Sequence, residues 1–195
     1  GLKCQLVTVI KTWGSSPRPE GAMLAICEDG QVVGSVSGGC IEDDLIERVR
    51  NEGIQRTLPD IVTYGITADE AHRFGLPCGG TIQLALEPLS PQSRITELLE
   101  RLSAHQLVAR RLDLQTGEVR LDQASSGMSL QVSATALTTI HGPRWRLLII
   151  GAGQLSRFLA SIAVGMDYHV TVCDPREEYR TGWQVDGVQV VHAMP

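Results

Sequence analysis

A glycine turn close to the C-terminus constrains the fold more than any other feature of this sequence. Residues 146–150 are typical of a short buried strand, and Gly151 and Gly153 follow them directly. Helix-compatible sequence comes next, and a second strand-like run over residues 168–173 ends at Asp174. Because strand, glycine turn, helix, strand and acid occur in this order, the sequence predicts a Rossmann-like β-α-β unit.

Nucleotide binding is one interpretation of this unit. Gly151 would permit the tight turn, and Gly153 would let a phosphate approach the backbone N–H groups at the helix N-terminus. Asp174 lies about 20 residues further on, where an acid bonds ribose hydroxyls, and Arg176 is a candidate partner for a phosphate. Ser156, however, stands where the full dinucleotide motif has a third glycine. Binding of NAD(P) or another nucleotide and a purely structural glycine turn therefore both remain open.

A cluster of breaking residues separates this unit from the rest of the chain. His141-Gly142-Pro143 precedes the apolar run and predicts a domain boundary. We expect an α/β protein in which a mixed α+β domain over residues 1–141 is followed by an incomplete Rossmann-like domain over residues 144–195. The second domain has roughly half the length of a complete doubly wound sheet, so the sequence predicts a piece of a longer protein.

Hydrophobic periodicity and turn signals predict the elements of the first domain. Asp29-Gly30 predicts a two-residue type I′ hairpin turn, and the acidic residues after Cys40 predict that a helix begins there. Strands are expected over residues 5–12, 22–28, 31–36, 61–64, 81–87, 108–121 with a turn at Thr116-Gly117, and 128–133, and helices over residues 41–50 and 91–105.

Charge and hydropathy exclude two classes of partner. The 195-residue chain carries a net charge of −5, and Arg110-Arg111 is its longest basic cluster, which is too little to bind nucleic acid through the phosphate backbone. It contains no apolar run close to the roughly 20 residues that cross a bilayer, and no charged segment followed by an apolar one at the N-terminus. We therefore expect a cytoplasmic protein with no nucleic-acid partner and no membrane partner.

The cysteines divide into two groups. Their number, five, is odd and none forms a CxxC pair, so we expect reduced thiols and neither a disulfide framework nor a zinc ribbon. Cys4, Cys27 and Cys173 are flanked by strand-like sequence and are expected to be small buried hydrophobes. Cys40 and Cys78 instead adjoin glycine pairs, so a functional role and simple packing are both open for them. The dispersed histidines predict no zinc or iron site.

The segment before Cys40 is the first candidate site. Ser37-Gly38-Gly39 would place backbone N–H groups and the Cys40 thiol at one point ahead of a helix, which suits an anion or the oxygen-rich edge of a cofactor. Glu42 stands in the first helical turn, where a carboxylate either handles a proton or simply complements the helix dipole. Its negative charge disfavours a thiolate at Cys40.

Two further loops are candidates for binding. The glycines after Cys78 would let a bulky ligand approach the backbone, and a polar loop near the N-terminus offers a guanidinium donor for phosphate and two hydroxyls. An ordinary connecting loop is the alternative for the polar loop near the N-terminus. The residues concerned are Gly79 and Gly80 in the first loop and Ser15, Ser16 and Arg18 in the second.

Three segments of the first domain resemble the XdhC/CoxI family and occur in that family's order. The glycine turn and the Asp174-Pro175-Arg176 segment resemble the family's C-terminal domain. The family's usual leading helix, before Gln5, is nearly absent here. The three segments are Thr12–Arg18 (TWGSSPR) with Gly21–Met23, Val36–Glu42 (VSGGCIE) and Cys78–Thr81 (CGGT).

The resemblance implies an accessory protein rather than an oxidoreductase. It implies a chaperone that binds and protects the molybdenum cofactor, assists its sulfuration through a cysteine desulfurase, and inserts it into an apo-molybdoenzyme of the xanthine dehydrogenase family. By position, Cys40 and Cys78 become candidates for contact with the cofactor's molybdenum or sulfur, and the loop with Arg18 becomes a candidate for its pterin or phosphate end. An NAD(P)-dependent oxidoreductase and a nucleotide-sensing module are the alternatives, although no proton-transfer residue for hydride chemistry is evident. A homodimer is expected because symmetric pairs are the commonest oligomers.

Overall fold

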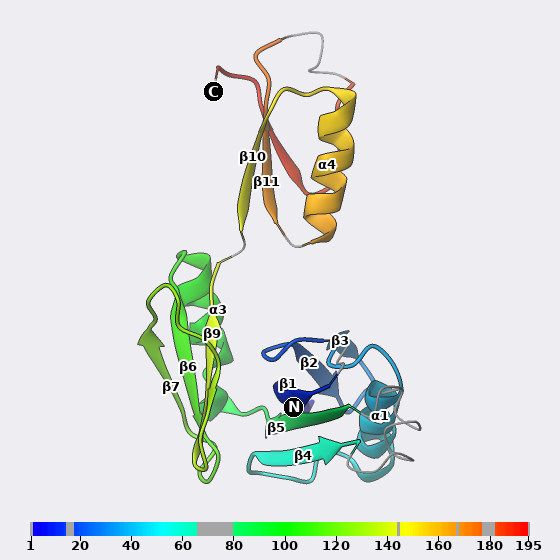
Figure 1. The fold of residues 1–195 in the computed structure, drawn as a ribbon, viewed down its shortest axis with the longest axis vertical. Helices are drawn as coiled ribbons and strands as arrows, with labels where there is room; N and C mark the ends of the chain where they lie inside the picture. Colours follow the sequence, from blue (N-terminus) through cyan, green and yellow to red (C-terminus); the bar gives the residue numbers. More distant parts are fainter. Residues whose placement is uncertain are drawn as a thin grey trace. The chain divides into compact units, whose positions relative to one another are not determined.

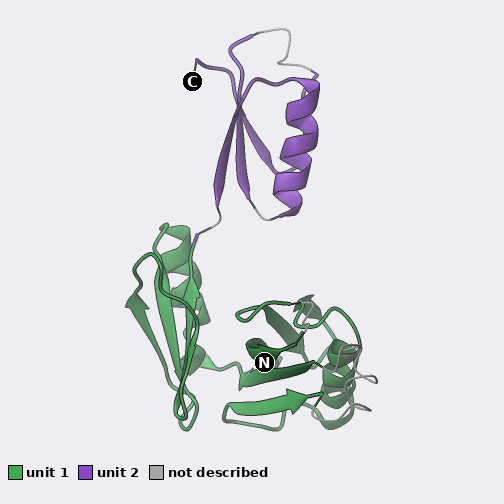
Figure 2. Ribbon diagram, in the orientation of Figure 1, with its two compact units in different colours: residues 1–142 green, residues 143–195 purple. Residues whose placement is uncertain are grey.

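The computed structural model describes residues 2–14, 18–65, 80–143, 145–166, 168–176 and 182–194. The chain forms two compact units, residues 1–142 and 143–195 (Figure 2), and each unit has a hydrophobic core of its own. The division falls between Gly142 and Pro143, within the cluster of breaking residues.

Unit 1 is built on a five-stranded antiparallel sheet in the order β3-β2-β1-β5-β4 (Figure 1). The strands expected over residues 5–12, 61–64 and 81–87 are confirmed. The strands of this sheet are β1 Cys4–Trp13, β2 Met23–Cys27, β3 Val32–Gly34, β4 Asp60–Tyr64 and β5 Thr81–Pro88.

Helix α1, Cys40–Glu52, covers one face of this sheet. Its buried side chains Ile41, Leu45 and Val49 recur every four residues and therefore lie on one side of the helix, where they join Val7 of β1 and Leu84 of β5 in the core. The expected helix and its start near Cys40 are confirmed.

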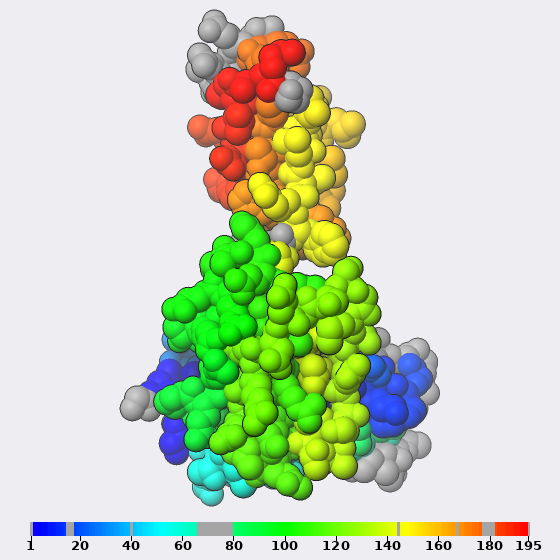
Figure 3. Space-filling view, turned by 90° about the vertical axis from the view of Figure 1, so that its left-hand side faces the viewer, coloured from blue at the N-terminus to red at the C-terminus, as the bar shows by residue number. Residues whose placement is uncertain are grey.

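The opposite face of the sheet packs against a second layer, which Figure 3 shows from outside. The core there combines Ile10 of β1 and Ala85 of β5 with Leu98 of α3 and Leu137 of a four-stranded sheet in the order β7-β6-β9-β8. Because side chains alternate across a strand, Ala85 faces this layer while its neighbours in β5 face α1. The elements of the layer are η1 Pro91–Ser93, α3 Ile95–Ser103, β6 Val108–Asp113, β7 Val119–Gln123, β8 Gln131–Val132 and β9 Ala136–His141.

A buried ion pair joins the two sheets. Nη2 of Arg110 on β6 donates to Oε1 of Glu87 on β5 over 2.5 Å and to the carbonyl oxygen of Ser93 over 3.1 Å, and both charged side chains are at most 5% exposed. Beside this pair, Oγ1 of Thr139 lies 2.7 Å from Nε2 of His141. Burial and the positive charge of Arg110 lower the pKa of His141 to about 4.

The hairpin turn between β2 and β3 differs from the type I′ turn expected. That turn needs positive φ at both central residues, but Gly30 has φ 86° while Asp29 is not among the described non-glycine residues with positive φ. The N–H group of Cys27 donates to the carbonyl oxygen of Gln31, so the loop contains three residues, 28–30, instead of two.

Two more elements of unit 1 correct the expectations. The helix expected over residues 91–105 is broken because Arg94 has φ 51°, which separates η1 from α3. The strand expected over residues 128–133 is reduced to β8, and β9 is an additional strand that pairs with β6 along its whole length.

The expectation of reduced thiols is wrong for Cys4 and Cys27, which form a disulfide. The two cysteines face each other on β1 and β2 with their Cα atoms 4.0 Å apart. Directly opposed side chains of antiparallel strands are close enough for such a bond, and the 23-residue separation in sequence does not reveal that they are opposed. Cys173 is free and buried, as expected.

Unit 2 contains a three-stranded parallel sheet in the order β10-β11-β12, with helix α4 on one face (Figure 1). Ala160 and Ala163 of α4 pack against Val170 and Val172 of β11. The expected order of strand, glycine turn, helix and strand is confirmed. The elements are β10 Arg146–Ile150, α4 Gln154–Gly165, β11 His169–Cys173 and β12 Val188–Val191.

Candidate functional site

Segments from three of the loops singled out in the sequence meet at one end of the five-stranded sheet. Because neighbouring strands are antiparallel, β1, β3 and β4 end where β2 and β5 begin. Gly14, the segment 35–39 and Gly80 therefore all lie at this end. Distant parts of the chain that converge on a rigid sheet are a common basis for binding sites.

Gly14 and Gly80 lie in direct contact there. A Cβ atom placed on Gly14 would be 3.3 Å from the Cα atom of Gly80, and Gly14 has φ 76°. Their neighbours Trp13 and Thr81 are paired across β1 and β5, and the Thr81 hydroxyl donates to the carbonyl oxygen of Gly65 over 3.0 Å. The sequence predicted that a ligand approaches the backbone near Gly80. The structure shows that the chain's own Gly14 accounts for at least part of this close approach.

The first residue of α1 is Cys40, so the helix N-terminus points to the same end of the sheet. Ser37 is buried, whereas Gly38 and Gly39 are exposed, and a Cβ atom on either glycine would meet nothing within 4 Å. Ser15, Ser16, Cys78 and Gly79 lie outside the described residues, so their assignment to the site stays a prediction.

Glu42 reaches back from the first turn of α1 into the segment 35–39. Its Oε1 accepts hydrogen bonds from the N–H groups of Val36, Ser37 and Gly38 over 3.0, 2.8 and 2.7 Å and from the Ser35 hydroxyl over 2.9 Å. Its Oε2 accepts the N–H group of Gly39 over 3.0 Å and the Ser37 hydroxyl. Successive N–H groups that converge in this way form an anion-binding nest, and here the anion is the chain's own carboxylate.

The charge state of Glu42 follows from this geometry. Burial alone would raise the pKa of Glu42, but the hydrogen bonds from the Ser37 hydroxyl and from the N–H groups of residues 37–39 outweigh it and hold the pKa well below its usual range. The carboxylate is therefore ionised at neutral pH.

Arg18 is connected to the same segment through Ser35. Its Nε donates to the Ser35 hydroxyl oxygen over 3.1 Å, and that hydroxyl donates in turn to Glu42. Ser35 was not among the residues singled out in the sequence. Its position directly after β3, two residues before Ser37, is the only sequence signal that could have indicated it.

The glycine turn of unit 2 is also bound to a carboxylate of the chain. Oδ2 of Asp174, whose side chain is 1% exposed, accepts the N–H group of Ala152 over 2.7 Å. Arg176 donates to the same carboxylate from N, Nε and Nη2 over 3.0, 3.0 and 2.8 Å. The hydrogen bonds from the Arg176 side chain, followed by that from Ala152, hold the pKa of Asp174 well below its usual range. A ribose at this position would have to share a carboxylate that already has partners.

The remaining residues of the turn have structural contacts. Gly151 has φ 99°, as a tight turn between strand and helix requires. Its carbonyl oxygen accepts the Ser156 hydroxyl over 2.5 Å, and the carbonyl oxygen of Gly153 accepts Nε1 of Trp183 over 3.1 Å. Ser156, at the third position of the motif, therefore contributes a hydrogen bond that a glycine could not make.

Neither a metal-binding cluster nor a membrane-spanning helix is found in the described part of the chain. Within it, no three His, Cys, Asp or Glu side chains are placed to hold a metal ion, so contact of Cys40 and Cys78 with molybdenum stays a prediction. None of the helices in the described ranges has the length and apolar character that a membrane span requires.

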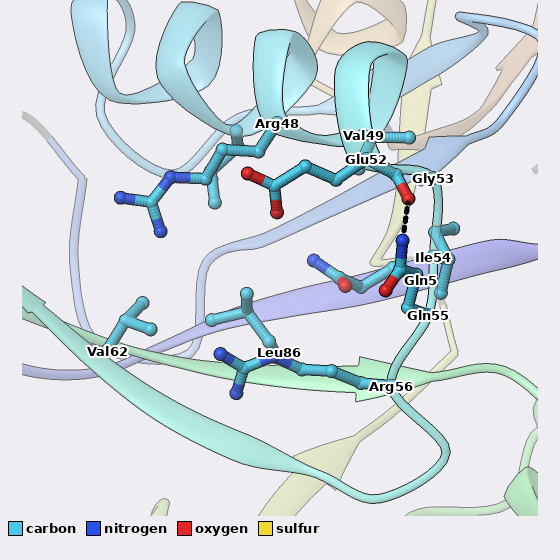
Figure 4. A pocket seen from close by; sticks show the side chains of 11 residues that line it. Gln5, Arg48, Val49, Glu52, Gly53, Ile54, Gln55, Arg56, Val62 and Leu86 are labelled. Atoms are coloured by element: carbon cyan, nitrogen blue, oxygen red, sulfur yellow. Dashed lines mark hydrogen bonds between the residues drawn. The ribbon is translucent and has the colours of Figure 1, made fainter.

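A cavity of about 190 Å³ lies at the other end of the sheet, between the second half of α1 and strands β1, β4 and β5 (Figure 4). The amide of Gln5 and the carboxylate of Glu52 extend into it from β1 and α1. At about 3.3 Å per residue, the nine residues from Gln5 to Gly14 span about 30 Å. No residue singled out in the sequence lines this cavity, and it is smaller than the ~300 Å³ at which small-molecule sites begin.

Residues 1–65 match the model of the XdhC and CoxI family. The matched range includes Arg18, the segment 35–39, Cys40 and Glu42, but ends before Cys78 and Gly80.

Three similar proteins cover most of the chain. The molybdenum cofactor insertion chaperone PaoD of Escherichia coli is 29% identical over 187 residues, which are 87% of this chain and 53% of PaoD. A protein of Bacillus subtilis named as a probable xanthine dehydrogenase subunit is 23% identical over 201 residues, covering 90% of this chain and 61% of that protein. A crystal structure described as a xanthine dehydrogenase from Bacillus halodurans superposes with a TM-score of 0.77 at 27% identity, covering 97% of this chain and 63% of that one.

This chain thus spans between half and two thirds of the length of each of these proteins. The family match includes two of the three segments on which the resemblance rests, and the relatives named for the molybdenum cofactor and for xanthine dehydrogenase extend the similarity over both units. These findings confirm the resemblance to the XdhC and CoxI family, whose model matches residues 1–65 of this chain.

Proposed function

We propose that this chain is the cofactor-binding part of a molybdenum cofactor insertion chaperone that serves a molybdoenzyme of the xanthine dehydrogenase family. The observation that carries the proposal is the convergence of Arg18, the segment 35–39 with Cys40, and Gly80 at one end of the sheet. The name of PaoD supports the choice of the molybdenum cofactor over other ligands of similar size.

The residues at this end of the sheet fit such a cofactor in three respects. Exposed Gly38 and Gly39 leave the space beside the start of α1 open, which a bulky pterin needs. Cys40 supplies sulfur, a soft donor that suits molybdenum or its sulfur ligand better than oxygen donors do. Arg18 brings a positive charge to the same loops, where the phosphate end of the cofactor would lie.

The proposed function also involves partner proteins, the oligomeric state and unit 2. We propose that the client is an apo-molybdoenzyme of the xanthine dehydrogenase family, that a cysteine desulfurase acts while the cofactor is bound, and that the protein is a homodimer. Its cytoplasmic location also stays a prediction. For unit 2 we propose the start of a Rossmann-like sheet, supported by its parallel strands and by the turn at Gly151.

The first experiment measures retention of purified molybdenum cofactor under anaerobic conditions, by ultrafiltration and by fluorescence of the oxidised pterin. Cys40→Ala and Cys78→Ala are compared with Cys173→Ala, a matched control in which a buried cysteine of unit 2 is shortened by the same atom. We expect wild type and Cys173→Ala to retain the cofactor and at least one of the other two variants to lose it. A folded wild-type protein that retains no cofactor would contradict the proposal.

A further inference from the structure

We infer that Glu42 is a positioning residue whose carboxylate, acting as an internal anion, fills the backbone cradle ahead of Cys40. The cradle consists of the N–H groups of residues 36–39 and the hydroxyl groups of Ser35 and Ser37. The inference deepens the proposed function, and only its cofactor measurement depends on that function.

The number of donors argues against a direct role of Glu42 in binding. Six donors converge on its two oxygen atoms, four from the backbone and two from serine hydroxyls. A carboxylate has about four lone-pair sites, so these donors saturate it. A saturated carboxylate has little capacity to accept a hydrogen bond from a cofactor or a proton from a reacting group. This argues against the proton-handling role that the sequence had left open for Glu42.

The same geometry closes the cradle to external anions. A helix capping box satisfies one backbone N–H group with such a side chain, whereas Glu42 satisfies all four N–H groups of the cradle. An anion tethered on the same chain has an effective concentration of at least about the millimolar range. A phosphate group would have to displace it and then lie beside its charge. Ser37, Gly38 and Gly39 therefore act on the cofactor through the shape of the loop and not through their N–H groups.

By closing the cradle, the carboxylate of Glu42 positions the backbone at Cys40. The cradle ends at Gly39, and Cys40 follows as the first residue of α1, so the carboxylate sets the path of the backbone into Cys40. The hydroxyl of Ser35 connects Glu42 to Arg18. One charged group thus holds two of the three motif segments in register with each other.

Chemical rescue by acetate tests the inference in the absence of any cofactor. Glu42→Ala opens a space with the shape of a carboxylate, and Glu42→Gln fills that space with an uncharged amide whose NH2 group faces the donors. Glu47→Ala is the matched control, because Glu47 is exposed on the same helix. Thermal unfolding is measured in sodium acetate and in sodium chloride of equal ionic strength, at constant pH.

We expect Glu42→Ala to lower the Tm by on the order of 10 °C in chloride, and 100 mM acetate to restore about 3–5 °C of this loss. Wild type, Glu47→Ala and Glu42→Gln should show no shift specific to acetate. If Glu42→Ala does not fold in chloride, the yield of folded protein in acetate replaces the Tm. Equal acetate shifts in wild type and Glu42→Ala, or a Glu42→Gln variant as stable as wild type, would overturn the inference.

The cofactor measurement separates this inference from the proposed function. We expect Glu42→Ala to weaken cofactor retention about 10–100-fold, the usual effect of removing a group that orients a ligand-binding residue, and acetate to recover part of it. Acetate rescue of stability together with no retention by wild type would overturn the proposed function and leave the cradle in place. Retention by wild type together with an acetate-insensitive Glu42→Ala variant would overturn the cradle alone.

Discussion

The starts of α1 and α4 differ in how a carboxylate holds the backbone ahead of the helix. At α1 the carboxylate of Glu42 comes from the helix itself and binds four N–H groups and two hydroxyls of the preceding loop. At α4 the carboxylate of Asp174 comes from the end of β11 and binds one N–H group of the glycine turn, that of Ala152. Within the described part of the chain, its other hydrogen bonds come from Arg176.

The difference shows what a glycine-rich segment before a helix can and cannot indicate. Both segments have the composition of an anion site, yet in both a carboxylate of the chain accepts N–H groups that a ligand would use. At α1 the carboxylate determines the shape of a whole loop, whereas at α4 it connects a strand to a turn and shares its charge with a half-exposed arginine. We therefore expect the start of α1 to be rigid and the start of α4 to be more easily rearranged.

The largest expected effect tests directly whether the start of α1 is held more strongly than the start of α4. Glu42→Gln should lower the free energy of unfolding by about 3–5 kcal/mol, because several charged hydrogen bonds are lost and the new NH2 group faces N–H donors. Asp174→Asn should cost less, because its remaining carbonyl oxygen can still accept the N–H group of Ala152. Urea denaturation gives the free energies, and hydrogen exchange followed by mass spectrometry assigns each loss to a unit. An Asp174→Asn loss as large as that of Glu42→Gln would reverse the ranking.

An effect of intermediate size is expected in the pH dependence of stability, which should differ between the two units. The pKa values of Glu42 and Asp174 lie below the normal range, so both carboxylates stabilise the fold above the pKa of the unfolded chain and lose this contribution as pH falls further. His141 adds a second dependence in unit 1 alone. Because its pKa in the fold is lowered to about 4, stability is fully present above about pH 6.5 and falls between pH 6.5 and 4, by up to ~3 kcal/mol.

Hydrogen exchange between pH 7 and 4.5 measures this dependence unit by unit. We expect unit 1 to lose protection in this range, and His141→Gln to remove most of the pH dependence while lowering stability at pH 7. Glu87 and Arg110 remain paired beside it in that variant. A wild-type unit 1 whose protection is constant from pH 7 to 4.5 would show that the His141 side chain gains protons as easily in the fold as outside it.

Local signals in the sequence predicted the elements better than they predicted the contacts. The turn at Gly151, the start of α1 at Cys40 and the hairpin around Gly30 depend on neighbouring residues, and the sequence located all three. The break at Arg94 was missed because a single residue in the left-handed region leaves the apolar spacing of a helix unchanged.

The candidate site was located in part for the same reason. The glycine pairs, Cys40 and Glu42 were recognisable by type and position, but the saturation of Glu42 depends on how the backbone of residues 35–39 folds back onto the first turn of α1, three to seven residues away. The Cys4–Cys27 disulfide depends instead on which strands pair. Composition and spacing do not reveal the strand pairing behind the disulfide, and they do not reveal the backbone angles of a glycine-rich loop, because glycine permits many of them.

The smallest expected effect concerns the outer partners of the two carboxylates. Arg176→Ala should lower the free energy of unfolding by no more than about 0.5 kcal/mol, because its side chain is 52% exposed and solvent screens the pair. Ser35→Ala should cost about 1 kcal/mol, because Glu42 loses one of its donors while Arg18 loses the hydroxyl oxygen that connects it to the loop. Both variants remove a side-chain donor and leave the backbone hydrogen bonds of each carboxylate in place. The free energies of unfolding from urea denaturation can therefore be compared directly. A larger loss for Arg176→Ala than for Ser35→Ala would mean that the arginine, and not the N–H group of Ala152, holds the start of α4, and the two helix N-termini would then be equally rigid.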